Sequence, residues 1–110
     1  KFSEEDKTKS YDFLGECDNL IEKIRIPRGK LRNIVRKQGK NVNPKLEEST
    51  DRFNQIFDNI QNLSYKFIEE IDQGKIDKFD KFYEKYNSEI RGFKEKIPIM
   101  KREIREFGIY

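Results

Sequence analysis

The residues of this chain that are best suited to chemistry are positive side chains concentrated between residues 23 and 45. This segment contains nine Lys or Arg and no Asp or Glu, whereas the net charge of the whole chain is only +3. A local excess of one sign is typical of a surface that binds a partner of the opposite charge. The candidate anion-binding residues are Arg25, Arg28, Lys30, Arg32, Arg36, Lys37 and Lys40.

Three of these candidates, Arg28, Arg32 and Arg36, are spaced by four residues, and Arg25 leads into them. Residues four apart lie on one flank of a helix, because a turn takes about 3.6 residues. A guanidinium group presents its donors as a planar fork that matches two phosphate oxygens. The spacing therefore indicates a row of arginines that is suited to phosphate.

Three kinds of anionic partner fit such a row. Nucleic-acid backbone is the most concrete, since a basic row on a helix is typical of phosphate binding. Segment 23–45 has no aromatic residue, which disfavours base stacking and favours contact with little sequence preference. An acidic protein surface is the second kind of partner. An anionic membrane is disfavoured, because the apolar residues of the segment are needed for the core and leave no face to insert.

The same charges also fit a surface that contacts only solvent and keeps the protein soluble. In that case the chain is a protein–protein interaction module, such as a scaffold, assembly or effector domain, that uses a helix face elsewhere. Regular heptads leave a homodimer open as well, because two copies can close a bundle between them.

The sequence offers little that supports catalysis. It has no His, which removes the commonest general base and the commonest metal ligand. The single Cys17 falls on an apolar seam and is expected to be a buried filler rather than a nucleophile. Acidic residues between 69 and 84 alternate with lysines, as on an ion-paired helix face. We therefore expect no enzyme, no metal site and no cofactor.

Composition indicates one folded domain over residues 1–110, since 34% of the chain is hydrophobic while 41% is charged. The chain starts at Lys1 rather than Met, which suggests a processed chain or a piece of a longer protein. It shows neither the ~20 apolar residues of a membrane span nor a signal-peptide core. The lone Cys fits a reducing compartment, so we expect an intracellular protein of the cytoplasm or nucleus.

Three amphipathic segments must position the basic residues. The first is expected to be helical from about 4 to 38, with a Ser3–Asp6 capping box at its start and Gly39 at its end. A kink or break is expected at Ile26–Pro27, because proline removes a helical hydrogen bond. The apolar seam of this segment comprises Leu14, Cys17, Ile21, Ile24, Leu31 and Val35, with Ile34 also facing inward.

The second segment is expected to run from about 44 to 72, with Asn43 as N-cap, Pro44 at the first helical position and Gly74 as stop. Its seam comprises Leu46, Phe53, Ile56, Ile60, Leu63 and Phe67, widened by Phe57 and Ile71.

The third segment is expected to form one helix kinked at Pro98, or two short-linked helices, from about 75 to 108. Its Phe and Tyr are interpreted as core rather than as a recognition surface. Its seam alternates steps of three and four through Ile76, Phe79, Tyr83, Tyr86, Ile90, Phe93, Ile97, Met100, Ile104 and Phe107.

Short connections at 39–43 and 73–75 force neighbouring helices to run antiparallel. The predicted fold is an all-α, antiparallel, up-down-up three-helix bundle with proline kinks in the first and third helices, or five helices if kinks count as breaks. The predicted function is non-enzymatic: a binding or adaptor domain whose basic end engages an anionic partner, with nucleic-acid backbone as first choice.

Overall fold

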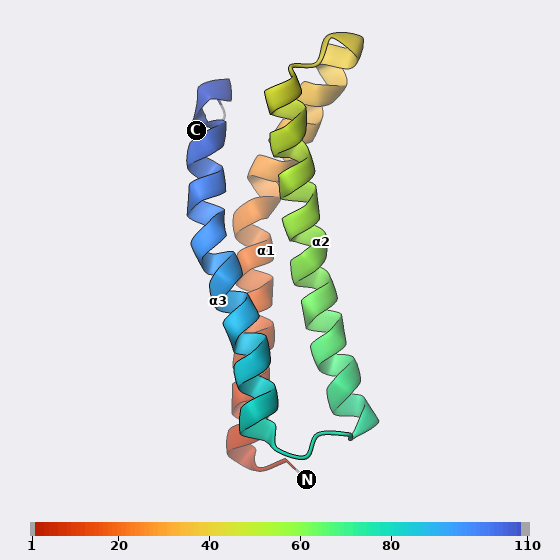
Figure 1. Ribbon diagram of the computed structural model, residues 1–110, viewed down its shortest axis with the longest axis vertical. Coiled ribbons are helices and arrows are strands. Elements are labelled where there is room, and N and C mark those ends of the chain that lie inside the picture. Colours follow the sequence, from red (N-terminus) through yellow and green to blue (C-terminus); the bar gives the residue numbers. More distant parts are fainter. Residues whose placement is uncertain (1, 109–110) are drawn as a thin grey trace.

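The computed structural model describes residues 2–108, and three long helices make up most of this part of the chain (Figure 1). α1 spans Glu4–Gln38, α2 spans Pro44–Gln73 and α3 spans Phe79–Glu103. The short 3-10 helix η1 (Gly39–Asn41) links α1 to α2, and η2 (Ile104–Phe107) continues α3. The helices alternate in direction along a rod of 55 × 22 × 17 Å, so the predicted all-α up-down-up bundle is confirmed.

Local signals in the sequence determine where α1 and α2 begin. The Ser3 hydroxyl oxygen accepts from the backbone N–H of Asp6 at 3.0 Å, and the Asp6 carboxylate accepts from the N–H of Ser3 at 3.2 Å. At the start of α2, the Asn43 side-chain oxygen accepts from the N–H of Lys45 at 2.9 Å. These caps satisfy N–H groups that have no partner within the helix.

The two internal prolines interrupt neither helix. Pro27 lies inside α1 and Pro98 inside α3, so the kinks do not count as breaks and the description with three helices applies. The Pro27 side chain is itself fully buried. It occupies a core-facing position between the buried residues Ile24 and Leu31, and the helix continues through it although one hydrogen bond is missing.

The third helix begins later than predicted. Gly74 adopts a left-handed backbone with φ 65° and reverses the chain, and residues 75–78 then form the connection to Phe79. Ile76 was predicted to open the apolar seam, but it lies in this connection and is only half-buried. The spacing of Ile76 matches the seam by coincidence, because a pattern of apolar residues does not show where a helix begins.

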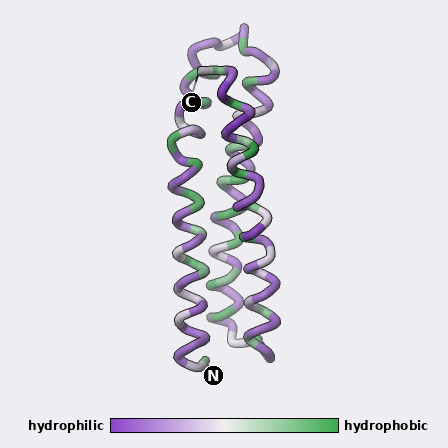
Figure 2. The backbone as a smooth tube through the Cα atoms, turned by 90° about the vertical axis from the view of Figure 1, so that its left-hand side faces the viewer, coloured by the Kyte–Doolittle hydropathy of each residue, from purple (hydrophilic) through white to green (hydrophobic). Residues whose placement is uncertain are grey.

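An apolar core runs along the rod, and Figure 2 shows hydrophobic positions recurring turn by turn on all three helices. In α1 the buried positions step by four and three from Phe13 to Leu31. The prediction took Leu14 for this seam, but Leu14 is half-buried and its neighbour Phe13 is only 1% exposed. The buried seam of α1 is Phe13, Cys17, Leu20, Ile24, Pro27 and Leu31, and Ile21, which was predicted for the seam, is buried beside it.

Aromatic side chains fill the core near the start of α1. Phe13 stacks on Phe67 with ring centroids 4.3 Å apart, and both rings meet Tyr86 edge-on at 5.8 and 5.3 Å. The Tyr86 hydroxyl donates to a Glu70 carboxylate oxygen at 2.6 Å, which gives its polar atom a partner inside the bundle. Tyr86 of α3 is therefore core, as predicted for the aromatic residues of this segment.

A matched pair of glycine substitutions tests these helix boundaries. Gly15→Ala should raise the free energy of unfolding by about 0.5–1 kcal/mol, because glycine is unfavourable inside a helix and an added methyl group meets no atom within 4 Å. Gly74→Ala should lower it, because a left-handed backbone is strained for alanine. Urea denaturation followed by circular dichroism measures both. A lower stability for Gly15→Ala would contradict the assigned helix.

The single cysteine provides a second test. Cys17 is 0% exposed, and burial, assisted by the nearby Asp18 and Glu16, raises the pKa of its thiol to about 12. Since only the thiolate reacts, labelling by a disulfide reagent at mildly alkaline pH should be slow in the native protein and fast in denaturant. In a Cys17→Ser background, exposed Ser88→Cys should label quickly. Equal native rates at the two positions would show that Cys17 is not in the core.

Candidate nucleic-acid interface

The basic segment lies at the end of the rod where α1 passes into α2. Residues 28–45, which we call the hairpin tip, comprise the last turns of α1, η1 and the start of α2. Figure 1 shows the tip extending past the C-terminal end of α3. Leu31 is still buried, but Ile34 and Val35, which were predicted to face inward, are only half-buried. The tip is therefore the part of the bundle that the third helix covers least.

Two of the predicted binding residues already have partners within the protein. Arg25 pairs with Glu22 of the same helix at 3.1 Å. The half-buried Arg28 donates from Nε to the Asn54 side-chain oxygen at 2.9 Å, and its guanidinium lies 4.2 Å from the centre of the Phe57 ring. Arg28 thus joins α1 to α2.

The environment of Arg28 also affects its charge. Burial lowers the pKa of this guanidinium, the charge of Arg32 lowers it further, and Asp58 acts in the opposite direction. An arginine remains protonated at neutral pH despite such a shift, so Arg28 contributes positive charge at the base of the tip while its donors are partly used.

The remaining candidates are available to a partner. The five remaining candidates are exposed, and no carboxylate among residues 2–108 lies within ion-pair distance of them. These are Lys30, Arg32, Arg36, Lys37 and Lys40.

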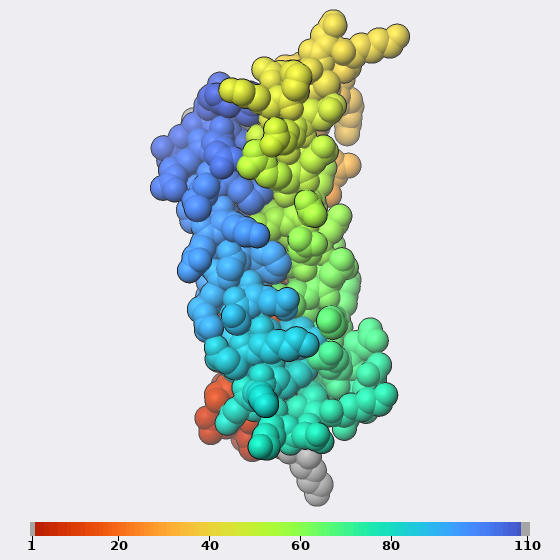
Figure 3. Space-filling view, viewed as in Figure 1, coloured from red at the N-terminus to blue at the C-terminus, as the bar shows by residue number. Residues whose placement is uncertain are grey.

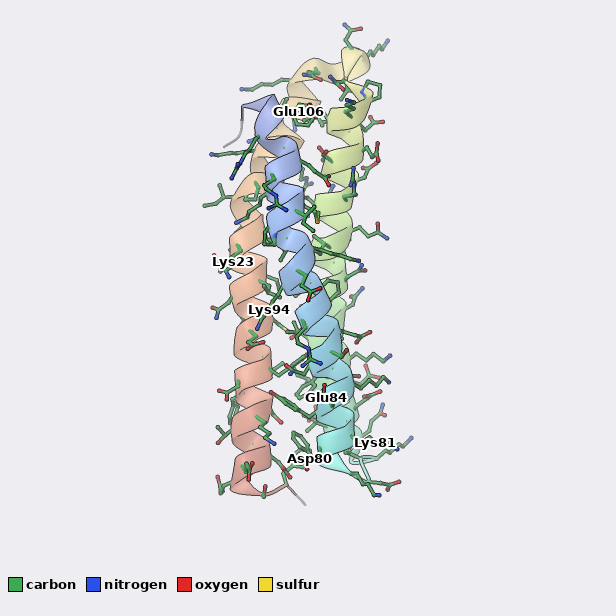
Figure 4. All side chains as sticks on the ribbon, turned by 60° about the vertical axis from the view of Figure 1, so that its left-hand side comes forward. Lys23, Asp80, Lys81, Glu84, Lys94 and Glu106 are labelled. Atoms are coloured by element: carbon green, nitrogen blue, oxygen red, sulfur yellow. The ribbon has the colours of Figure 1, made fainter. Side chains whose placement is uncertain are left out.

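The rest of the rod differs from the tip, because ion pairs connect its helices. Arg52 of α2 contacts Glu103 next to η2 at 3.0 Å, and Lys9 of α1 contacts Asp80 of α3 at 3.7 Å. Lys94, which Figure 4 shows on the side of α3 toward α1, contacts Glu16 at 2.8 Å. Exposed lysines elsewhere on the rod, such as Lys66 and Lys81, also make no ion pair within the described part of the chain, but acidic residues alternate with them along the chain, whereas residues 23–45 contain no Asp or Glu.

The predicted arginine row exists, but it turns around the helix. Four residues advance about 40° beyond a full turn. Arg28 therefore faces Asn54 and Phe57 of α2, while Arg32 and Arg36 point progressively away from α2 and are exposed. Arg32 and Arg36 can therefore bind a partner directly, whereas Arg28 would first have to break its contacts with α2.

The end of α3 adds basic residues that sequence reasoning missed. Arg102 lines a shallow hollow together with Lys45 at the start of α2. The two residues are far apart in the chain, and only the antiparallel path of the helices brings them together. Carboxylates share this hollow, including Glu48 and Glu106, and Figure 4 shows Glu106 at this end of the rod. The hollow is thus balanced in charge, unlike the tip.

The structure also bears on two other kinds of site. Within residues 2–108, no three side chains of His, Cys, Asp or Glu are grouped so that they could hold a metal ion. None of the helices in this part of the chain has both the length and the apolar character needed to cross a lipid bilayer.

Comparison with known proteins finds no matching family model, no matching curated protein and no matching solved structure. A function for this chain has to be inferred from the side chains and their arrangement.

Proposed function

We propose that this protein is a non-enzymatic binding domain whose hairpin tip engages an anionic partner, with nucleic-acid backbone as the preferred one. The observation that carries the proposal is the absence of carboxylates from residues 23–45, a segment that includes the whole hairpin tip, whereas acidic residues alternate with the cations along the rest of the rod and form ion pairs between its helices. The exposed cations of this short and protruding hairpin, which include all five remaining candidates, produce a positive potential that attracts a polyanion.

Part of this charge also has a local role. Arg36 and Lys37 lie in the last turn of α1, where cations offset the negative end of the helix dipole by about 0.3–1 kcal/mol each. This effect falls off within one turn. It accounts for neither Lys30 nor Arg32, which lie further back in the helix, so the tip carries more charge than helix stability requires.

The side chains around the tip favour backbone contact over base recognition by stacking. Phe57, the aromatic ring nearest to the arginine row, is covered by the guanidinium of Arg28. The aromatic side chains that are most exposed, Tyr11 and Tyr65, lie toward the opposite end of the rod. A partner at the tip would meet charge and hydrogen-bond donors but no stacking platform.

A protein–protein interaction module is the second candidate, and one observation favours it. A groove of about 390 Å³ between α2 and α3 is lined by both polar and apolar side chains; the apolar ones include Phe93 and Ile99, and Ile99 is 48% exposed. The boundary between these helices crosses the face shown in Figure 3. An amphipathic helix of another protein would find apolar contacts there, away from the hairpin tip.

Charge reversal at the tip tests the proposal. Wild-type protein should bind mixed-sequence nucleic acid at about 50 mM salt, and the logarithm of the binding constant should fall by about 0.7–0.9 per phosphate contact per logarithm of salt. Arg32→Glu with Arg36→Glu should abolish this binding without unfolding the bundle, since neither side chain has an internal partner. Fluorescence anisotropy measures the binding, and circular dichroism checks the fold.

A matched control separates a local site from net charge. Lys66→Glu with Lys81→Glu makes the same change of charge at exposed positions far from the tip (Lys81 in Figure 4) and should leave most of the binding. Equal losses in the two double variants would show that the tip has no special role. If wild-type protein binds neither mixed DNA nor mixed RNA at this salt, the nucleic-acid proposal is wrong.

A further inference from the structure

The outer side of α1 carries two rows of cations rather than one. Each residue of a helix advances about 100° around the axis. Arg25, Arg32 and Arg36 therefore fall within about 40° of one another, on the flank where Arg28 contacts α2. Lys23, Lys30 and Lys37, which are spaced by seven, fall within a second arc of about 40°. This second flank faces α3, because Lys23 lines a hollow together with Lys94 and Ile97.

A strip without charge separates the two rows. Ile26, Gly29 and Asn33 lie between them on the helix and opposite the buried positions Ile24 and Leu31. Ile26 is 63% exposed although it is apolar, and no atom lies within 4 Å of a methyl group added at Gly29. We call this strip of Ile26, Gly29 and Asn33 the ridge. It faces solvent, with cations along both of its sides.

We infer that the ridge enters the major groove of duplex DNA, with the arginine row on one phosphate strand and the lysine row on the other. The inference rests on the proposed function and specifies its ligand. The major groove of B-form DNA is about 12 Å wide and admits an α-helix, which measures about 10–12 Å across with its side chains. Residues 23–37 extend about 21 Å at 1.5 Å per residue, long enough to place three lysines on one side and Arg32 and Arg36 on the other, with Arg25, which pairs with Glu22, preceding them.

The ridge is selective for the form of nucleic acid. The major groove of duplex RNA is deep and narrow, so a helix cannot enter it. Single strands have no groove and are held by aromatic stacking, which the ridge does not provide. Isoleucine can contact a thymine methyl group and asparagine can hydrogen-bond to a base edge, so Ile26 and Asn33 give the ridge groups that can touch bases between the two phosphate strands.

The first test compares three ligands of one sequence: a DNA duplex of about two helical turns, the corresponding RNA duplex and the single DNA strand. Anisotropy titrations should show the DNA duplex binding roughly tenfold tighter or more than the other two. Equal affinity for DNA and RNA duplexes would overturn this inference and leave the proposed function standing. Failure to bind any of the three would overturn both.

The second test adds bulk to the ridge without changing any charge. Gly29→Phe should weaken binding of the DNA duplex by roughly tenfold or more, because a ring on the ridge would meet the floor of the groove. Gly29→Ala should bind like wild type, and so should Gly15→Phe, which places the same ring on α1 outside the ridge, at another position with open space. Circular dichroism verifies that each variant is helical. Unchanged DNA binding by Gly29→Phe would overturn the inference.

The third test removes the lysine row. Lys30→Ala with Lys37→Ala should reduce the salt slope of DNA binding by roughly two phosphate contacts, and Arg32→Ala with Arg36→Ala should reduce it by a similar amount. A slope that depends on the arginine row alone would show that only one strand is contacted and would overturn the inference.

Discussion

The rotation of α1 about its own axis determines which of its charges face outward, and the buried seam from Phe13 to Leu31 fixes that rotation. Each large apolar side chain in such a seam contributes about 1.5–3 kcal/mol through burial. Turning the helix by one residue would expose part of the seam and bring charged side chains toward the core, where an unpaired charge is costly. The cations of the segment therefore have a defined direction, and the surface at the hairpin tip follows from the packing beneath it.

Most of the fold could be predicted from local features of the sequence. The caps at Ser3 and Asn43 and the left-handed Gly74 mark helix ends through interactions among neighbouring residues. The errors arose where a decision depends on distant parts of the chain. Apolar spacing alone does not show that the seam passes through Phe13 rather than Leu14, since the choice depends on contacts with Phe67 and Tyr86.

The candidate site was predictable in position but not in detail. The absence of carboxylates from residues 23–45 was visible in the sequence, whereas the engagement of Arg28 by Asn54 and Phe57 required the neighbouring helix to be placed. The lysine row on the other flank has a heptad spacing that could have been recognised. Its role as one side of a binding surface could not be predicted from the sequence, because the position of the uncharged ridge between the two rows depends on how α1 packs.

Acetylation of lysines, read residue by residue by mass spectrometry with and without duplex DNA, tests most directly whether the outward face of the tip is the binding surface. The account predicts that Lys30 and Lys37 react readily in the free protein and are protected by the duplex. Lys66 and Lys81, which lie on α2 and α3 far from the tip, should react equally in both states. Equal protection of these four lysines, or protection of Lys66 and Lys81 alone, would contradict the account.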